Sequence, residues 1–380
     1  MNKRIPLFIA VILLINIPGD VYTCTVAVIS GEATPDGRPL LWKNRDSSHR
    51  DNAVQYYHGP KYKFIGIINS GDTAQVWMGV NEAGLAIMNS ESKDLEGSEY
   101  DDEGYLMKYV LGHFATVEEF QEYLESTNVE GRAVTSNFGV IDAQGRAGFF
   151  ETGNHTYTFF DANTAPHGFL TRANYAETGD GEGYGYYRCG RATELLEQTA
   201  KKKAITHKYI LQQVARDIQT EEVSPYPFES IAIDTIPTSA TVNRHRTVSA
   251  AVFHGAKPGE NPLRVAMWCI LGEPIAGVAT PFWVASGGVG EAVEDSENGA
   301  KLNRAIQDIE SQMYPNSNET TLIFPRKVAQ NLNANLVLEN LILEATWHFL
   351  ENRDFNQPDR KKLQKFQEVT QQAVFLNLTR

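Results

Sequence analysis

The sequence predicts an α+β fold, in which a β-rich body is followed by a helical C-terminal segment. Between residues 24 and 290, short β-branched and aromatic runs alternate with turn signals, and helical patterns are inserted only in places. Beyond Gly299 the spacing of apolar residues becomes helical throughout. Because 42% of the residues are hydrophobic, the chain can bury a large core. We therefore expect a body at 24–298 and a helical extension at 299–380 that packs on it.

The N-terminus has the pattern of a secretory signal peptide. Lys3 and Arg4 form a basic start, and residues 5–17 form an apolar run. This run is too short to span a bilayer as a helix. We expect residues 1–23 to be removed, so that a secreted or periplasmic chain begins at Cys24. A lipid anchor on this cysteine is the minor alternative.

Strands of the body are predicted where apolar or β-branched runs meet turn signals. The expected strands are 25–30, 39–43, 137–141, 147–151, 248–254 and 263–271. The first two flank Pro35-Asp36-Gly37, and this arrangement predicts a hairpin. The last run is apolar almost throughout, which predicts a strand buried on both faces.

Helices are predicted from caps and from the period of apolar residues. Thr116 and Glu119 form a capping box, which predicts a helix start. Further helices are expected at 193–200 and 209–219. The extension carries two apolar stripes, formed by Leu302, Ile306, Ile309 and Met313, and by Leu332, Leu336, Ile342, Ala345 and Leu350.

Composition and missing motifs exclude several function classes. The chain has 34 basic and 47 acidic residues and a net charge of −13, so a nucleic-acid partner is not expected. Neither a His-Glu-x-x-His zinc motif nor a Gly-x-Ser-x-Gly elbow occurs. The glycine-dense stretch 179–185 lacks phosphate-loop spacing and is expected to be a loop. We expect no metal, no cofactor and no membrane span in the mature chain.

Cys24 would carry a thiol and a free α-amine on one residue once the leader is removed. An α-amine with a pKa of roughly 7.7 to 8.0 can accept a thiol proton near neutral pH. The chain has three cysteines, so at least one thiol of an exported chain stays free or pairs between molecules. Cys24 is therefore the candidate nucleophile. A structural disulfide with Cys189 or Cys269 is the alternative.

The opening Cys24-Thr25 and the segment Asn44-Arg45-Asp46 resemble a known family. They are similar to the N-terminal nucleophile hydrolases of the acyl-coenzyme A:6-aminopenicillanic acid acyltransferase-like family, whose relatives include choloylglycine hydrolases, penicillin V acylases and a dipeptidase family. The similarity extends to about Trp283. It implies a four-layer αββα sandwich of two antiparallel sheets, with Cys24 at the start of a central strand and no cofactor.

The resemblance also implies roles for later residues. Asp46 resembles the aspartate that orients the amine of the nucleophile. Asn174, within 170–175, resembles the asparagine that donates to the oxyanion, and Asn89 is a candidate oxyanion or substrate-binding residue. Arg246 aligns best with a further active-site arginine, and Arg244 lies on the same face of the chain.

One position departs from the relatives. They usually have an arginine just before the asparagine that aligns with Asn44, and this chain has Lys43. Side chains alternate along a strand, so Lys43 and Arg45 share one face. Which of these two cations approaches Cys24 is left open by the sequence.

The resemblance implies cleavage of a linear amide through an acyl-thioester on Cys24. Water as the acceptor gives a hydrolase and an amine gives an acyltransferase, and the sequence leaves both open. A dipeptidase of the same superfamily and an inactive exported binding protein are the alternatives. The expected partner is a small acylated amine or amino-acid amide, and homo-oligomer formation is left open.

Overall fold

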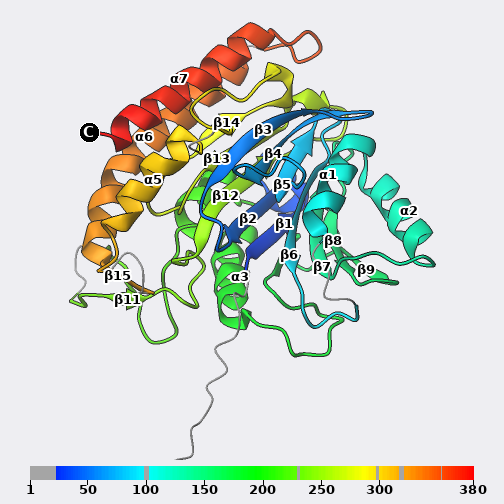
Figure 1. Cartoon of the computed structure of the whole chain (residues 1–380), viewed down its shortest axis with the longest axis horizontal. Helices are drawn as coiled ribbons and strands as arrows, with labels where there is room; N and C mark the ends of the chain where they lie inside the picture. Colours follow the sequence, from blue (N-terminus) through cyan, green and yellow to red (C-terminus); the bar gives the residue numbers. More distant parts are fainter. Residues whose placement is uncertain (1–22, 98–101, 229–231, 297–298, 316–320, 352) are drawn as a thin grey trace, which may run out of the picture.

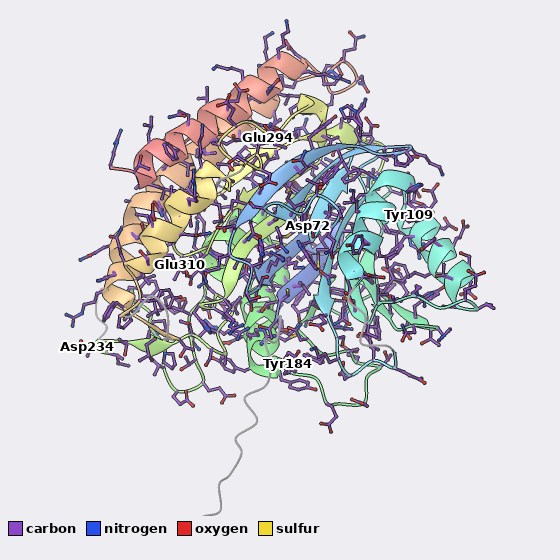
Figure 2. The ribbon with its side chains drawn as sticks, viewed as in Figure 1. Asp72, Tyr109, Tyr184, Asp234, Glu294 and Glu310 are labelled. Atoms are coloured by element: carbon purple, nitrogen blue, oxygen red, sulfur yellow. The ribbon has the colours of Figure 1, made fainter. Side chains whose placement is uncertain are left out.

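A computed structural model describes residues 23–97, 102–228, 232–296, 299–315, 321–351 and 353–380. Except for Thr23, the expected signal peptide lies outside the described residues. Figure 1 shows two β-sheets that face each other, with helices on both outer sides. Figure 2 shows side chains filling the space between these layers.

The first sheet contains the strand that follows Cys24. Its order is β10–β1–β2–β12–β13–β14, and all neighbouring strands are antiparallel. The strands are β1 (Thr25–Ile29), β2 (Leu40–Asp46), β10 (Phe169–Arg172), β12 (Thr247–His254), β13 (Ala266–Ile270) and β14 (Thr280–Phe282). Because β1 lies between β10 and β2, its start is fixed on both sides.

The second sheet is an antiparallel meander in chain order from β3 to β9. Its strands are β3 (Asn52–His58), β4 (Lys63–Asn69), β5 (Met78–Asn81), β6 (Ala86–Glu91), β7 (Ser136–Ile141), β8 (Ala147–Thr152) and β9 (Tyr157–Asp161). Strands β1 and β2 pack on β6 and β7. At Gly139 a Cβ atom would lie 3.0 Å from Val28 Cγ2 and closer still to Met88, so glycine permits this close approach.

Helices complete four layers. Helix α1 (Glu103–His113) packs on the second sheet, and α2 (Val117–Thr127) lies beside it. Helix α3 (Tyr186–Ala200), the short α4 (His207–Tyr209) and the π-helical η2 (Ile210–Val214) cover the outer face of the first sheet. The predicted αββα order of an α+β fold is thereby confirmed.

The C-terminal segment forms three helices, α5 (Lys301–Ser311), α6 (Pro325–Glu351) and α7 (Arg360–Leu378). Helices α6 and α7 pack on β14, the edge strand of the first sheet (Figure 1). Two short strands, β11 (Ile236–Pro237) and β15 (Leu322–Ile323), pair nearby. Short 3-10 turns occur at η1 (Gly31–Ala33), η4 (Pro262–Arg264) and η5 (Val284–Ser286).

Most predicted elements occur, with shifted ends. Both hairpins form, and Thr116 Oγ1 accepts from the amide of Glu119 at the start of α2. The strand expected at 263–271 begins at Ala266, because the preceding residues form η4 behind a proline. Helix α3 begins seven residues before the predicted 193, and the helix expected at 209–219 ends at Val214.

The buried apolar stripe predicted for α6 is partly wrong. Leu332 and Ile342 are buried, but Ala345 is exposed. The buried face instead includes Asn335 and Glu339, which bond to the loop before β14. An apolar period cannot reveal a face that is buried through polar contacts.

Candidate active site

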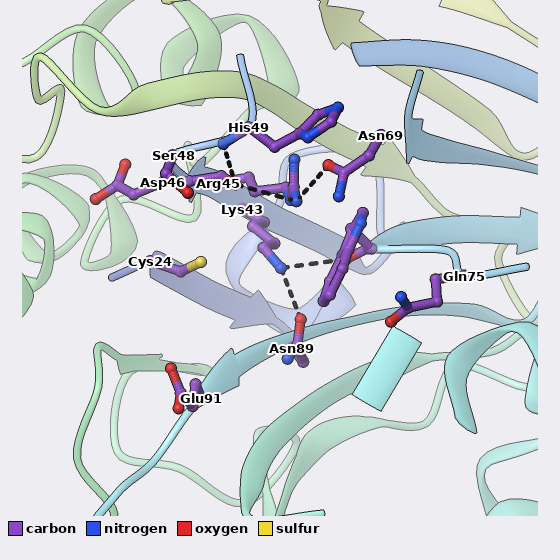
Figure 3. A pocket seen from close by; sticks show the side chains of 12 residues that line it. Cys24, Lys43, Arg45, Asp46, Ser48, His49, Asn69, Gln75, Asn89 and Glu91 are labelled. Carbon is purple, nitrogen blue, oxygen red and sulfur yellow. Dashed lines mark hydrogen bonds between the residues drawn. The ribbon is translucent and has the colours of Figure 1, made fainter. Parts of the chain in front are cut away.

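A cavity of about 330 Å³ opens between the two sheets, at the start of β1 and the end of β2 (Figure 3). The residues that line it are Cys24, Lys43, Arg45, Asp46, Ser47, Ser48, His49, Asn69, Gln75, Trp77, Asn89 and Glu91. Four of the six site residues expected from the sequence therefore meet here, because the sandwich brings β2 of the first sheet against β6 of the second.

Cys24 directly precedes β1 and is buried, with 6% of its surface exposed. Its sulfur points into the cavity toward Lys43 (Figure 3). Its backbone nitrogen points elsewhere and donates to Asn174 Oδ1 over 2.8 Å. The thiol and the nitrogen of Cys24 thus have separate surroundings.

Asp46, the last residue of β2, is held by three donors. Its carboxylate accepts from Thr23 Oγ1 at 3.0 Å, from Arg244 Nη1 at 2.9 Å and from Thr247 Oγ1 at 2.7 Å. The pairing of β12 with β2 shifts register just beyond Thr247, and such irregularities re-aim side chains. Asp46 and its neighbour Arg45 both line the cavity, which lies at the end of β2.

The two arginines after β11 have different surroundings. Arg244 forms the ion pair with Asp46 and is almost fully buried. Arg246, the better match by sequence, is half-buried, and its carbonyl accepts from the amide of Ser47. Neither arginine is among the residues that line the cavity, and the side chain of Arg244 bonds to Asp46, which is one of them. An active-site role of Arg246 stays a prediction.

Asn174 contacts Cys24 through its side-chain oxygen. Oδ1 accepts from the Cys24 nitrogen and also from Arg188 Nη2, at 2.6 Å, while Nδ2 donates to the carbonyl of Glu91 at 2.8 Å. A peptide N–H and a guanidinium can only donate, so this orientation of the amide is required. The oxyanion-donor role of Asn174 stays a prediction.

Arg188 is a site residue that the sequence reasoning missed. It lies in the first turn of α3, is 4% exposed, and its Nε donates to the Cys24 carbonyl over 3.4 Å. Burial lowers the pKa of Arg188, while the nearby carboxylate of Asp46 acts in the opposite direction. The spacing of residues could have indicated its burial, because Arg188 lies four residues before Ala192 on the buried face of α3.

Lys43 is the cation that faces the thiol. It is 1% exposed, and Nζ donates to the Trp77 carbonyl at 3.1 Å and to Asn89 Oδ1 at 2.7 Å. Burial lowers the pKa of Lys43 to about 8, although the charge of Cys24 favours the protonated form. Asn89 accepts from Lys43 and donates to Ser136 Oγ, and its role as an oxyanion or substrate-binding residue stays a prediction.

Arg45 is held by the second sheet. Its guanidinium donates to Asn52 Oδ1 and Asn69 Oδ1, each at 2.8 Å, and lies over the ring of Trp77. Glu91 was also missed by the sequence reasoning. It lies two residues after Asn89 on the same face of β6, and its carboxylate lies 3.4 Å from Lys93 Nζ.

All three cysteines are free thiols. Cys189 Sγ accepts from the Tyr175 hydroxyl at 3.2 Å, and burial strongly raises the pKa of Cys269 in β13. Within the described parts of the chain, no group of three or more His, Cys, Asp or Glu side chains could hold a metal ion. None of the described helices is both long and apolar enough to cross a membrane.

Comparisons with known proteins place these features in a family. The chain matches the family described as acyl-coenzyme A:6-aminopenicillanic acid acyl-transferase over residues 33–223, half of its length. No curated protein sequence matches it.

Three solved structures are similar at low identity. A variant of conjugated bile acid hydrolase from Clostridium perfringens is 16% identical, with a TM-score of 0.43, and the match covers 68% of this chain and 92% of that chain. An N-acylethanolamine-hydrolyzing acid amidase ortholog from Caenorhabditis elegans is 14% identical, with a TM-score of 0.41, and the match covers 62% of this chain and 94% of that chain. Penicillin V acylase from Agrobacterium tumefaciens is 15% identical, with a TM-score of 0.39, and the match covers 68% of this chain and 85% of that chain. The family match covers the segments around Asp46, Asn89 and Asn174. The chain belongs to the acyl-coenzyme A:6-aminopenicillanic acid acyl-transferase family of N-terminal nucleophile hydrolases.

Proposed function

We propose that this protein is an exported cysteine hydrolase that cleaves a linear amide through an acyl-thioester on Cys24. One observation carries the proposal: Cys24 directly precedes β1, with its sulfur in the cavity and its nitrogen bonded to Asn174. No other cysteine lines this cavity among the described residues. The expected substrate is a small acylated amine or amino-acid amide.

The proposal requires that residues 1–23 be removed, by signal peptidase or by self-cleavage. A nitrogen in a peptide bond cannot act as a base, whereas a free α-amine can. In the uncleaved chain the hydroxyl of Thr23 donates to Asp46. Loss of Thr23 frees an acceptor position on the carboxylate beside the new amine, and this supports a role for Asp46 in orienting it.

The reaction then proceeds in two balanced steps. The α-amine takes the thiol proton while Sγ bonds to the amide carbonyl carbon, which gives a tetrahedral oxyanion. The C–N bond breaks as the amine passes its proton to the leaving nitrogen, and a thioester remains. Water then adds to the thioester, the C–S bond breaks, and the products are a carboxylic acid and the restored thiol.

The surrounding charges favour a neutral, basic amine. Arg188 is permanently charged and close to the Cys24 backbone, and a nearby positive charge lowers the pKa of an amine. Asp46 acts in the opposite direction, but Arg244 largely balances its charge. An N–H of the amine can still donate to Asn174 Oδ1, which leaves the lone pair for the thiol proton.

Water is the proposed acceptor because a coenzyme A pool is not expected outside the cytoplasm, and acyl transfer to an amine is the alternative. The test is a panel of acyl-amino acids, bile-salt conjugates, phenoxyacetyl amides and dipeptides. Amine release is measured for a chain that begins at Cys24, with the Cys24→Ala variant as background. Cleavage of at least one class above that background is expected. If no class is cleaved, the proposal is wrong.

A further inference from the structure

Asn174, whose side-chain oxygen accepts from the Cys24 nitrogen, lies in a loop and not in a strand. Strand β10 ends at Arg172, and the backbone of Asn174 pairs with that of Tyr184 in an isolated two-residue bridge. A side chain that holds a reacting group within about 0.5 Å needs support from rigid elements. We therefore looked for contacts that fix the loop at 173–178.

Asn137, in β7 of the second sheet, contacts this loop on both sides of Asn174. Its Nδ2 donates to the carbonyl of Tyr175 at 2.9 Å and to the carbonyl of Ala173 at 3.4 Å. The side chain of Asn137 is fully buried. Since a carbonyl can only accept, the amide must present its nitrogen to the loop. Asn137 thereby holds the two residues that flank Asn174.

Glu151, in β8, holds the two ends of the same loop. It lies opposite Asn137 in the register of β7 and β8, so both side chains are on one face of the second sheet. Its buried carboxylate accepts from Arg172 Nε at 2.8 Å and from the amides of Glu177 and Thr178, each at 2.9 Å. The hydroxyl of Thr178 donates to it as well, at 2.7 Å. One carboxylate therefore joins the residue before the loop to its last two residues.

Stability alone does not account for these two polar side chains. Asn137 Oδ1 is buried and accepts from no described residue, and an unpaired buried acceptor lowers the unfolding free energy. Apart from a bond from Asn137 to Ser90 Oγ at 3.2 Å, the hydrogen bonds of both side chains within the described residues run to residues 172–178. Their common result is a fixed position for Asn174.

We infer that Asn137 and Glu151 are positioning residues for the Cys24 amine, on which they act by fixing Asn174 from the second sheet. The inference rests on the proposed function, in which an N–H of the amine donates to Asn174 Oδ1 and the lone pair takes the thiol proton. Neither positioning residue lines the cavity. A displacement of about 1 Å can lower a rate by about 10²-fold, so loss of either residue should slow the reaction although no reacting group is removed.

The test is a double-variant cycle of Asn137→Leu with Asn174→Ala in the chain that begins at Cys24. Two rates are measured: kcat/KM on a cleaved amide, and alkylation of Cys24 by iodoacetamide at pH 7, which needs no substrate. Asn137→Leu should lower kcat/KM about tenfold to a hundredfold. It should slow alkylation about threefold to tenfold, because a hydrogen bond to Asn174 Oδ1 favours the ammonium form of the amine and with it the thiolate. In the Asn174→Ala background the same substitution should change either rate by less than about twofold.

Asn335→Leu is the matched control. Asn335 is also buried, and its Nδ2 donates to the carbonyls of Ala276 and Gly277, in the loop before β14. This variant should keep both rates near those of the wild type, and urea unfolding measures the stability that each variant loses. Glu151→Gln replaces Asn137→Leu in the cycle if the latter does not fold, and it should show a smaller loss that again disappears in the Asn174→Ala background.

Three outcomes would overturn the inference. The first is a set of wild-type rates in Asn137→Leu, and the second is a pair of losses that multiply in the double variant, since Asn137 would then act independently of Asn174. The third is an equal loss of rate in Asn335→Leu, which would make the effect one of stability. The proposed function fails separately, when no amide of any class is cleaved, and the alkylation rates still test the positioning role in that case.

Discussion

Two clusters of buried charge lie on opposite faces of the first sheet, and they differ in how completely the protein satisfies them. On the cavity face, Lys43 uses two of its three N–H bonds. On the helix face, Arg216 forms a two-point ion pair with Glu339 of α6, at 2.9 and 2.7 Å, and its Nε donates to the carbonyl of Pro274. The first cluster has capacity for a ligand, whereas the second joins α6 to the body.

Strand β2 connects the two clusters through the alternation of its side chains. Lys43 points into the cavity, and the next residue, Asn44, donates to the carbonyl of Ala215, directly before Arg216. A buried charge whose hydrogen bonds are complete fixes an arrangement, and one that is incomplete costs stability and is available to a substrate. Variants on the cavity face should therefore change mainly the activity, and variants on the helix face should lower mainly the unfolding free energy.

The largest effect is expected at Cys24, the proposed nucleophile on the cavity face. Cys24→Ala should lower kcat/KM by about 10⁴-fold or more, because the covalent step is lost. Cys189→Ala and Cys269→Ala serve as controls and should keep most activity, since neither lines the cavity. Initial rates on one cleaved amide decide this, and comparable losses in the three variants would contradict the assignment.

Substitutions on the helix face should lower the unfolding free energy. Arg216→Met leaves the carboxylate of Glu339 buried without its cation, so the unfolding free energy should fall by about 3 to 5 kcal/mol. The double variant Arg216→Met/Glu339→Leu should recover much of this loss, because no charge then remains. Urea unfolding measures both. A loss below about 1 kcal/mol in the single variant would show that the pair does not hold α6.

The buried charge of Lys43 should lower the unfolding free energy, and this effect should depend on pH. Its pKa falls from 10.5 in the unfolded chain to about 8 in the fold, so the unfolded chain binds the proton more tightly between these values. The unfolding free energy of the wild type should therefore rise relative to Lys43→Met by about 3 kcal/mol from pH 8 to pH 10.5. The difference should be constant outside this window, and a flat difference within it would contradict the burial of the Lys43 ammonium.

The smallest expected effect concerns the amine. Replacing Arg188 by Gln removes a positive charge near the Cys24 nitrogen and raises the pKa of the amine. The acidic limb of the pH profile of kcat/KM should then shift to higher pH by about half to one unit, while Arg188→Lys should leave it nearly unchanged. A lower rate without a shift of the limb would give Arg188 a purely structural role.

Local patterns predicted much of this molecule. Both hairpins, the capped helix α2 and the helical C-terminal segment follow from turn residues, caps and apolar period. The sandwich and the grouping of Cys24, Asp46 and Asn89 came from the family resemblance. The contacts of Arg188 and Glu339 could not be predicted from the sequence, because each joins segments that are distant in the chain and meet only in the fold.

Side-chain direction was also beyond the sequence. The choice between Lys43 and Arg45 depends on which acceptors the second sheet presents, and Asn89 and Asn69 supply them. Likewise, Arg244 was placed on one face with Arg246, but residues 244–247 form a turn closed by a bond from the Thr247 amide to the Arg244 carbonyl, and Arg244 bonds to Asp46. A turn breaks the alternation of faces that holds along a strand.

The central claim is that Cys24 acts with the amine that cleavage exposes, and mass spectrometry of the protein expressed from the full sequence tests it most directly. The predicted result is an N-terminus of Cys-Thr-Val-Ala and, after brief exposure to a cleaved amide, an acyl mass on Cys24. A matched chain with one alanine placed before Cys24 should form no adduct. Full activity in that extended chain, or a lipid on the Cys24 amine of the active protein, would contradict the claim.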